Sequence, residues 1–265
     1  MKANNFFISI HPMLWVMAMA SFLSGQFLSF FVLFVLVLMH EAAHAMTAVF
    51  FRWEITKLTL LPFGGQLIVK KILNKPVSEE LAVIISGPLL HLLIHLIILN
   101  FQPSFFFTDE LYHLNLQLLL FNLLPVWPLD GGRICYCIAN LFFPFKKSIH
   151  ISIVCSLISL IVIIIHLLDG LQFQWMLLYL YTAVCTLQLY RNRHMLHKQF
   201  LLEKWGENAT DLKHKVQVVE GLTNIQVLVN KMYKGKKQRF ILLNNGKMIG
   251  NLSDVMIIKR YFSAS

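Results

Sequence analysis

Two histidines and a glutamate stand close together in an apolar stretch, in the run His40-Glu41-Ala42-Ala43-His44. In an α-helix of 3.6 residues per turn, His40 and His44 project from one face on successive turns and can bind one metal ion. Glu41 lies beside that face, where it can accept a proton from a water molecule on the metal. This is the HExxH pattern, in which two imidazoles hold zinc and the glutamate is the general base. A purely structural role is the alternative, but an ionised glutamate in an apolar helix costs about 2.5–3.5 kcal/mol and is rarely without function.

A catalytic zinc ion needs a third protein ligand and one open coordination position. The candidate is Asp130, a carboxylate in another apolar segment, which Pro125 and the pair Gly131-Gly132 must interrupt as a helix. Unwound backbone inside a membrane usually marks a site, although Asp-Gly is also a common turn pair. A ligand set of two histidines and an aspartate favours zinc and would also accept cobalt or iron.

A second pair of histidines, His91 and His95, has the same four-residue spacing but no carboxylate between its members. We expect these side chains to face the interior of a helix bundle, near the metal or a water path. A second metal site or haem ligation is the alternative.

The composition places all these residues in a membrane. Of the 265 residues 57% are hydrophobic and 14% are charged, with a mean hydropathy of +0.65. A soluble domain carries about a quarter charged residues, so a soluble enzyme, a disordered chain and a disulfide-rich secreted module are excluded. We predict an α-helical polytopic membrane protein with six transmembrane helices. The six apolar segments lie at about 8–25, 28–51, 81–100, 111–141, 150–168 and 172–190.

The Lys and Arg residues of the loops predict how these spans are oriented. They gather in the N-terminus, in 52–75, at 146–147 and from 191 onward, and are missing from 24–26, 101–110 and 169–172. Both termini are therefore expected on the cytoplasmic side. The stretch 60–69 is too short to span and contains Pro62 and Gly64-Gly65, so we expect a re-entrant loop or a short strand that lines a cavity.

Four parts of the sequence together resemble the site-2 protease family of intramembrane zinc metalloproteases. They are His40-Glu41-Ala42-Ala43-His44, Phe63-Gly64-Gly65, Ser86-Gly87-Pro88, and Asn122-Leu123-Leu124-Pro125 followed by Leu129-Asp130-Gly131. The resemblance covers about residues 30–140 and departs from the family at His91, where relatives often carry asparagine. The number of spans and the short tail are most similar to a branch found in endospore-forming bacteria.

The resemblance implies a role for each of these residues. His40, His44 and Asp130 would bind one zinc ion per subunit, and Glu41 would activate water. Asn122 and Pro125 would shape the substrate site, and the loop Phe63-Gly64-Gly65 would align the substrate as an added strand.

The resemblance also implies a biological setting, which is regulated intramembrane proteolysis during sporulation. The substrate would be a sigma-factor precursor that loses its N-terminal pro-sequence, and inhibitory membrane proteins would restrain the protease. The expected location is the mother-cell membrane that surrounds the forespore. The alternative function is a non-enzymatic metal carrier or sensor, gated by the cytoplasmic domain and dependent on His91 and His95.

The C-terminal part carries most of the charge, with fourteen Lys and Arg and five Asp and Glu from residue 191 onward, a net charge of +9. We expect a transmembrane domain over 1–190, a charged helical linker over 191–212 and an α/β domain over 213–265. The order strand, helix, strand, Asn-Gly turn, strand, helix resembles a single CBS (cystathionine-β-synthase) module, which is small enough to need a copy in another subunit.

The likeness to a CBS module implies homo-oligomers and ATP as a regulator. Met256 stands where an acidic ribose ligand is expected, so a purely structural pairing module is the equal alternative. No nucleic-acid motif accompanies the basic charge, and no nucleic-acid partner is expected.

Overall fold

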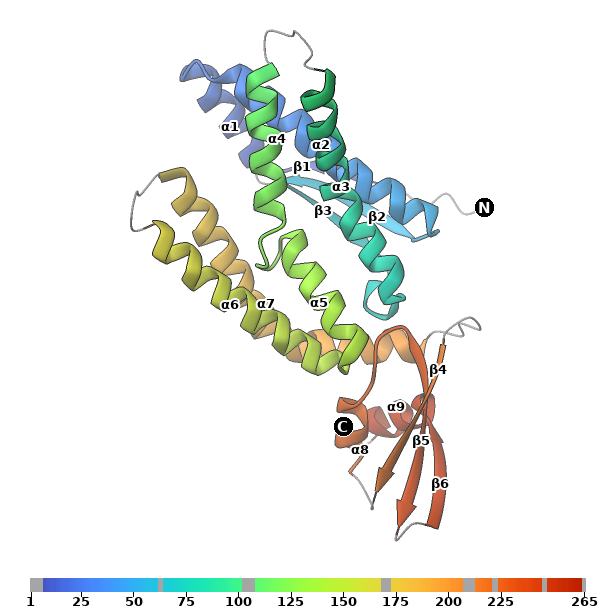
Figure 1. Ribbon diagram of the computed structural model, residues 1–265. Helices are drawn as coiled ribbons and strands as arrows, with labels where there is room; N and C mark the ends of the chain where they lie inside the picture. The colour runs from blue at the N-terminus through green and yellow to red at the C-terminus, as the bar shows by residue number, and fades with distance from the viewer. Residues whose placement is uncertain are drawn as a thin grey trace.

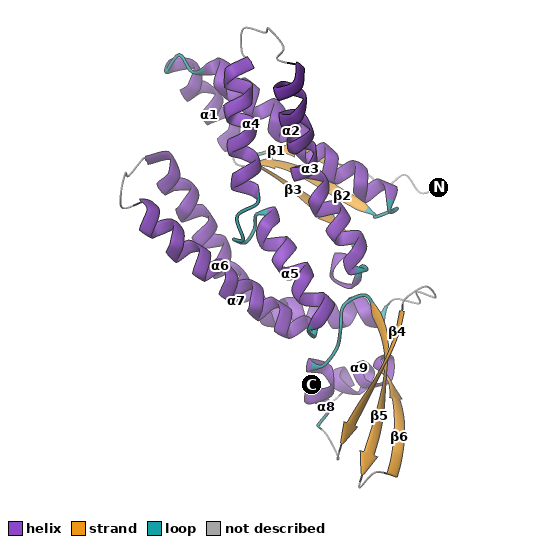
Figure 2. Ribbon diagram, viewed as in Figure 1, coloured by secondary structure: helices purple, strands orange, loops and turns teal. Residues whose placement is uncertain are grey.

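Helices make up most of the molecule in the computed structural model, which describes residues 7–61, 64–101, 108–167, 173–206, 213–220, 224–244 and 247–263. One small sheet lies among the N-terminal helices and a second forms the C-terminal end (Figures 1 and 2). The helices before the second sheet are α1 (Pro12–Leu23), α2 (Phe27–Phe50), α3 (Val77–Phe101), α4 (Thr108–Asn122), α5 (Asp130–Phe142), α6 (Phe145–Leu167) and α7 (Phe173–Trp205).

Three of these helices are long and apolar enough to cross a membrane within the described residues. They are α2, α3 and the part of α6 over Phe145–Ile164, with mean hydropathies of 1.9, 2.3 and 2.2. Helix α1 is apolar but shorter. The count of six spans therefore stays a prediction.

The first predicted span begins with a strand rather than in a helix. Strand β1 (Phe7–Ile10) pairs in parallel with β2 (Ile55–Leu61), which pairs antiparallel with β3 (Gly64–Val69). Helix α1 starts only at Pro12, a residue suited to the first helical position, where the His11 side chain accepts a hydrogen bond from the Met13 amide. The expectation of a span from residue 8 was wrong because residues 7–10 form the edge of a sheet.

The predicted break in the fourth apolar segment is confirmed. Helix α4 ends at Asn122 and α5 begins at Asp130. Glycine is needed at the start of α5, because a Cβ atom on Gly131 would overlap the carbonyl oxygens of Leu123 and Leu124 in the turn between the helices. The turn thus packs directly against the start of α5 and fixes the position of Asp130, the first residue of that helix.

The C-terminal unit has the predicted order of elements. Its strands are β4 (Lys213–Glu220), β5 (Lys236–Asn244) and β6 (Lys247–Ser253), and its helices are α8 (Ile225–Asn230) and α9 (Asp254–Ser263). Strand β4 pairs in parallel with β5, and β5 pairs antiparallel with β6. Residues 245 and 246 of the predicted Asn-Gly turn lie outside the described residues.

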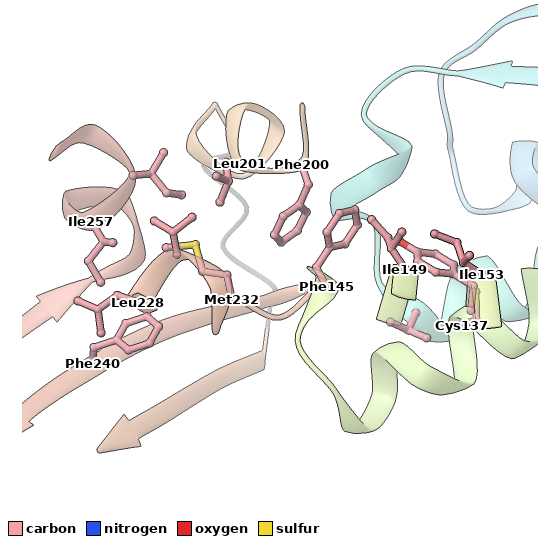
Figure 3. Packing of buried hydrophobic residues seen from close by; sticks show 14 of the residues in the cluster. Cys137, Phe145, Ile149, Ile153, Phe200, Leu201, Leu228, Met232, Phe240 and Ile257 are labelled. Atoms are coloured by element: carbon pink, nitrogen blue, oxygen red, sulfur yellow. The ribbon is translucent and has the colours of Figure 1, made fainter. Parts of the chain in front are cut away.

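A continuous apolar core joins this unit to the membrane helices (Figure 3). The ring of Phe145, at the start of α6, stacks on Phe200 of α7 with centroids 4.0 Å apart. Burial, with a smaller contribution from Lys146, lowers the pKa of the neighbouring His197 to about 4, so this ring is neutral at neutral pH. Helix α7 runs unbroken through the boundary expected at residue 190, because Phe200 and Leu201 bury their side chains in the shared core.

Buried ionic and polar contacts fix the C-terminal unit to the start of α3. The ammonium of Lys234 pairs with the carboxylate of Glu80, with side chains 1% and 6% exposed, and lies 5.3 Å from the Tyr136 ring centroid. Just before α3, the amides of Leu73 and Asn74 donate to the Glu203 carboxylate of α7, at 2.9 and 3.2 Å. The C-terminal unit therefore holds the first turn of α3 through Lys234, and α7 holds the segment that precedes it.

We expect Lys234 and Glu80 to stabilise the fold mainly because each compensates the buried charge of the other. Lys234→Met or Glu80→Met alone should lower the free energy of unfolding by about 3–5 kcal/mol, and the double variant Glu80→Met/Lys234→Met by much less. Denaturant unfolding of the four proteins in detergent measures this as a double-mutant cycle.

The exposed pair Lys70–Glu54, with side chains 55% and 61% exposed, is the matched control. Neutralising either of its partners should cost less than about 1 kcal/mol. Equal losses at the two pairs would contradict the assignment.

Candidate active site

Three side chains from two distant parts of the sequence converge in the bundle. Helix α2 brings the Nε2 atoms of His40 and His44 to 3.0 Å from each other. The Oδ2 atom of Asp130, at the first residue of α5, lies 3.1 Å from His40 Nε2 and 3.2 Å from His44 Nε2. All three residues are buried, and in the described part of the chain they form the one group of this kind that could hold a metal ion.

The hydrogen bonding of His44 shows that a cation fits between these atoms. Its Nδ1 lies 2.7 Å from the carbonyl oxygen of Val83, so Nδ1 carries the proton and Nε2 presents its lone pair. That lone pair faces the Asp130 carboxylate oxygen, which has no hydrogen-bond partner among the described residues. Zinc bound tetrahedrally at about 2.0–2.2 Å would hold such ligand atoms about 3.3–3.6 Å apart, slightly farther than the 3.0–3.2 Å observed.

Helix α3 packs unusually closely against both histidines. A Cβ atom on Gly87 would lie 2.5 Å from His40 Cε1 and 2.6 Å from His44 Nε2. Small residues allow such approach between membrane helices. Gly87, one turn after Val83, has no side chain and therefore leaves room for the two imidazole rings. The Ser86-Gly87-Pro88 run pointed to this contact, but sequence reasoning assigned it no role.

The carboxylate of Glu41 contacts the N-terminal sheet. Its Oε1 accepts a hydrogen bond of 2.8 Å from the amide of Gly65 in β3. Strand β3 is an edge strand, and since the Gly65 amide points to Glu41, the unpaired edge of β3 faces α2. A Cβ atom on Gly65 would lie 2.5 Å from the Cδ and Cγ atoms of Glu41, so this contact also needs glycine.

The expected substrate residues that the structure describes belong to β3, to the end of α4 and to the turn before α5. Gly64 opens β3, where it pairs with Leu61, and Phe63 lies outside the described residues. Asn122 ends α4 and donates to the Leu118 carbonyl oxygen within its own helix. The carbonyl oxygen of Pro125, in the turn that leads to α5, accepts from the hydroxyl of Ser159.

The two further histidines of α3 lie in different surroundings. The ring of His91 stacks on His40, with centroids 5.1 Å apart and planes at 23°. The ring of His95, one turn later, stacks on Tyr112 with centroids 4.7 Å apart. The expectation that both face the bundle interior near the metal holds for His91, and the four-residue spacing could not distinguish the two.

Comparisons with known proteins agree with this geometry. The model of peptidase family M50 matches residues 28–108, which include α2 and α3. Stage IV sporulation protein FB of Bacillus subtilis (strain 168) is 33% identical over 263 residues, which are 97% of this chain and 91% of that protein. A zinc metalloprotease of Methanocaldococcus jannaschii is 28% identical over 228 residues, 83% of this chain and 65% of the relative. The solved site-2 protease from Methanocaldococcus jannaschii superimposes with a TM-score of 0.57 at 28% identity, covering 71% of this chain and 92% of that one.

The close approach of α3 predicts that Gly87→Ala displaces the two imidazoles. Metal-site neighbours of this kind typically change affinity by about 10–100-fold, so the variant should bind zinc at least about tenfold more weakly than the parent. Metal content per purified chain and chelator competition measure the change. Gly250→Ala is the control, because an added Cβ atom there meets nothing within 4 Å. Parent-like affinity of Gly87→Ala would show that α3 does not confine the histidines.

Proposed function

The chain belongs to the site-2 protease family, peptidase family M50, and from this premise we propose which residues carry its chemistry. It is a membrane zinc metalloprotease that acts on a protein substrate. In the proposal, His40, His44 and Asp130 hold one zinc ion per subunit and Glu41 is the general base. The observation that carries it is the convergence of three buried ligand atoms within 3.2 Å beside Glu41.

In the proposed peptide hydrolysis, the zinc site and Glu41 have separate roles. Zinc, when bound, supplies a Lewis acid that polarises the scissile carbonyl and makes water easier to deprotonate. Glu41, held by the Gly65 amide at 2.8 Å, takes the proton from the attacking water and delivers it to the leaving amine. Burial of the whole group keeps the electrostatic interactions strong.

We place the substrate along the free edge of β3. A protease must hold its peptide extended, and an edge strand offers unpaired amide and carbonyl groups for that purpose. A peptide along this edge would pass beside Glu41, since that carboxylate accepts from the outward-facing Gly65 amide. Phe63, Asn122 and Pro125 complete the proposed substrate site. Asn122 ends α4, and Pro125 lies in the turn that leads to Asp130.

The proposed substrate is a sporulation sigma-factor precursor whose N-terminal pro-sequence is removed by regulated intramembrane proteolysis. Support comes from the 33% identity with stage IV sporulation protein FB along nearly the whole chain. The same relationship supports inhibitory membrane proteins as partners and the mother-cell membrane around the forespore as the location. Six spans with both termini in the cytoplasm complete this proposal.

The geometry favours this function over a metal carrier or sensor. A carrier path through His40, His44, His91 and His95 would need their nitrogens to face one another. Instead, His91 Nδ1 lies 2.7 Å from Asn115 Oδ1, and the His95 ring stacks on Tyr112.

The C-terminal unit over 213–265, after a linker at 191–212, is proposed to be a CBS-like module that joins subunits. Val219 faces the core at 3% exposure, whereas Val216 and Val218 on the opposite face of β4 are 58% and 60% exposed. Exposed apolar side chains of this kind favour a partner surface. Regulation by ATP remains part of the proposal, although Asp254 already accepts from the Gln238 amide inside the unit and pairs with Lys204 of α7.

Glu41→Gln separates proton transfer from metal binding. Its amide oxygen can still accept from Gly65, so the zinc content should stay at the parent level. Cleavage should fall by about 10²–10⁴-fold, since only the general base is lost. Co-expression with a membrane-associated precursor, followed by immunoblotting of the product, measures cleavage.

Asp130→Ala should lose both zinc and cleavage, and Glu54→Gln, at an exposed carboxylate, should retain both. A Glu41→Gln variant that cleaves at the parent rate would remove Glu41 from the mechanism.

The proposed subunit contact predicts that Val216→Lys/Val218→Lys shifts the detergent-solubilised protein toward the monomer. Two buried like charges per subunit would oppose association. Size-exclusion chromatography with light scattering measures the mass. Val255→Lys/Met256→Lys, which places the same added charge on α9 at residues 43% and 57% exposed, should leave the mass unchanged. A monomeric parent protein would contradict the contact itself.

A further inference from the structure

His91 is a fully buried imidazole beside the metal centre that the proposed chemistry does not use. Its ring lies 5.1 Å from that of His40, centroid to centroid, at an angle of 23°. It belongs to the line Val83, Gly87, His91, whose members follow at intervals of one turn and face α2. Each member of this line contacts one or both of the histidines of α2.

The two histidines of α2 are held in different ways. The Nδ1 atom of His44 has the Val83 carbonyl oxygen as its partner, at 2.7 Å. The Nδ1 atom of His40 is buried and has no hydrogen-bond partner among the described residues. A metal-binding histidine normally has its orientation fixed by a hydrogen bond from its second nitrogen. Another contact must therefore fix the plane of the His40 ring.

The ring that stacks on His40 is itself anchored from α4. Asn115, also fully buried, places its Oδ1 2.7 Å from His91 Nδ1 and donates from its Nδ2 to the His91 carbonyl oxygen at 2.9 Å. These two contacts fix both the side chain and the backbone of His91. An aromatic plane in a fixed position can hold a second ring in the offset geometry that such pairs prefer.

We infer that His91 is a positioning residue, whose Asn115-anchored ring holds His40 in the orientation that presents Nε2 to Asp130 and His44. The inference rests on the proposed zinc site and deepens it. The role belongs to the flat ring and not to a charge or a ligand atom. The two histidines are thus fixed by different means, His44 by a hydrogen bond and His40 by a stacked plane.

Three variants of the full chain in detergent test this role. His91→Ala should weaken zinc binding by about 10–100-fold, the usual effect of losing a group that orients a ligand. His91→Phe should recover most of that affinity, because a flat ring remains. The zinc affinity of Asn115→Ala should lie between those of His91→Ala and His91→Phe, because the His91 ring remains but loses its hydrogen bond to Asn115. Chelator competition gives the affinity, and the visible absorption spectrum of the Co²⁺-loaded protein reports the ligand geometry independently of activity.

His95→Ala is the matched control, because it removes the same ring from the next turn of α3, where the ring stacks on Tyr112. It should leave the zinc affinity and the Co²⁺ spectrum unchanged. Thermal unfolding of every variant shows whether the bundle stays folded. An equal loss of affinity in His91→Ala and His95→Ala would overturn the inference in favour of general packing.

Two further outcomes would overturn the inference while leaving the zinc site intact. One is parent-like affinity of His91→Ala. The other is His91→Phe binding as weakly as His91→Ala, which would mean that an imidazole nitrogen is needed. Failure of the zinc site itself has a different signature, which is parent protein that binds zinc no better than His40→Ala.

Discussion

The fold is organised around the burial of one carboxylate and two imidazoles in a part of the chain that has almost no other charge. His40, His44 and Asp130 are 4–5% exposed, and their ligand atoms lie within 3.2 Å of one another. Such a group costs free energy in apolar surroundings unless its charges are compensated. A divalent cation would supply that compensation, so the same interaction would account for the stability of the group and for its proposed chemistry.

Close packing of the backbone is the second requirement, and glycine meets it on three sides. Gly87 lets α3 approach both imidazoles, Gly65 lets β3 approach Glu41, and Gly131 lets the turn after α4 fold against α5. Each glycine belongs to a different element, so backbone from three elements packs closely here. This packing leaves polar backbone groups, such as the Gly65 amide and the Val83 carbonyl, beside the proposed reacting residues.

What the sequence predicts well is what local spacing determines. The interval between His40 and His44, the interruption before Asp130 and the order of elements after residue 213 all depend on neighbouring residues, and the structure has each of them. Pairings between distant segments were missed: β1 lies on β2 about fifty residues away, and Asn115 anchors His91. These contacts depend on three-dimensional packing, because Phe7–Ile10 is as apolar as the start of a span and Asn115 has no distinguishing motif.

Helix α3 connects the chemistry to the C-terminal unit. Glu80 pairs with Lys234 at its first turns, and Val83, less than one turn later, holds His44. Both Glu80 and Val83 lie in the part of α3 before Pro88, where the backbone hydrogen bonds of the helix resist bending. The loop that carries Lys234 also packs on Phe145, whose amide donates to the Met232 carbonyl oxygen. The proposed metal centre and the C-terminal unit therefore both contact the first turns of α3, through His44 and Lys234 respectively.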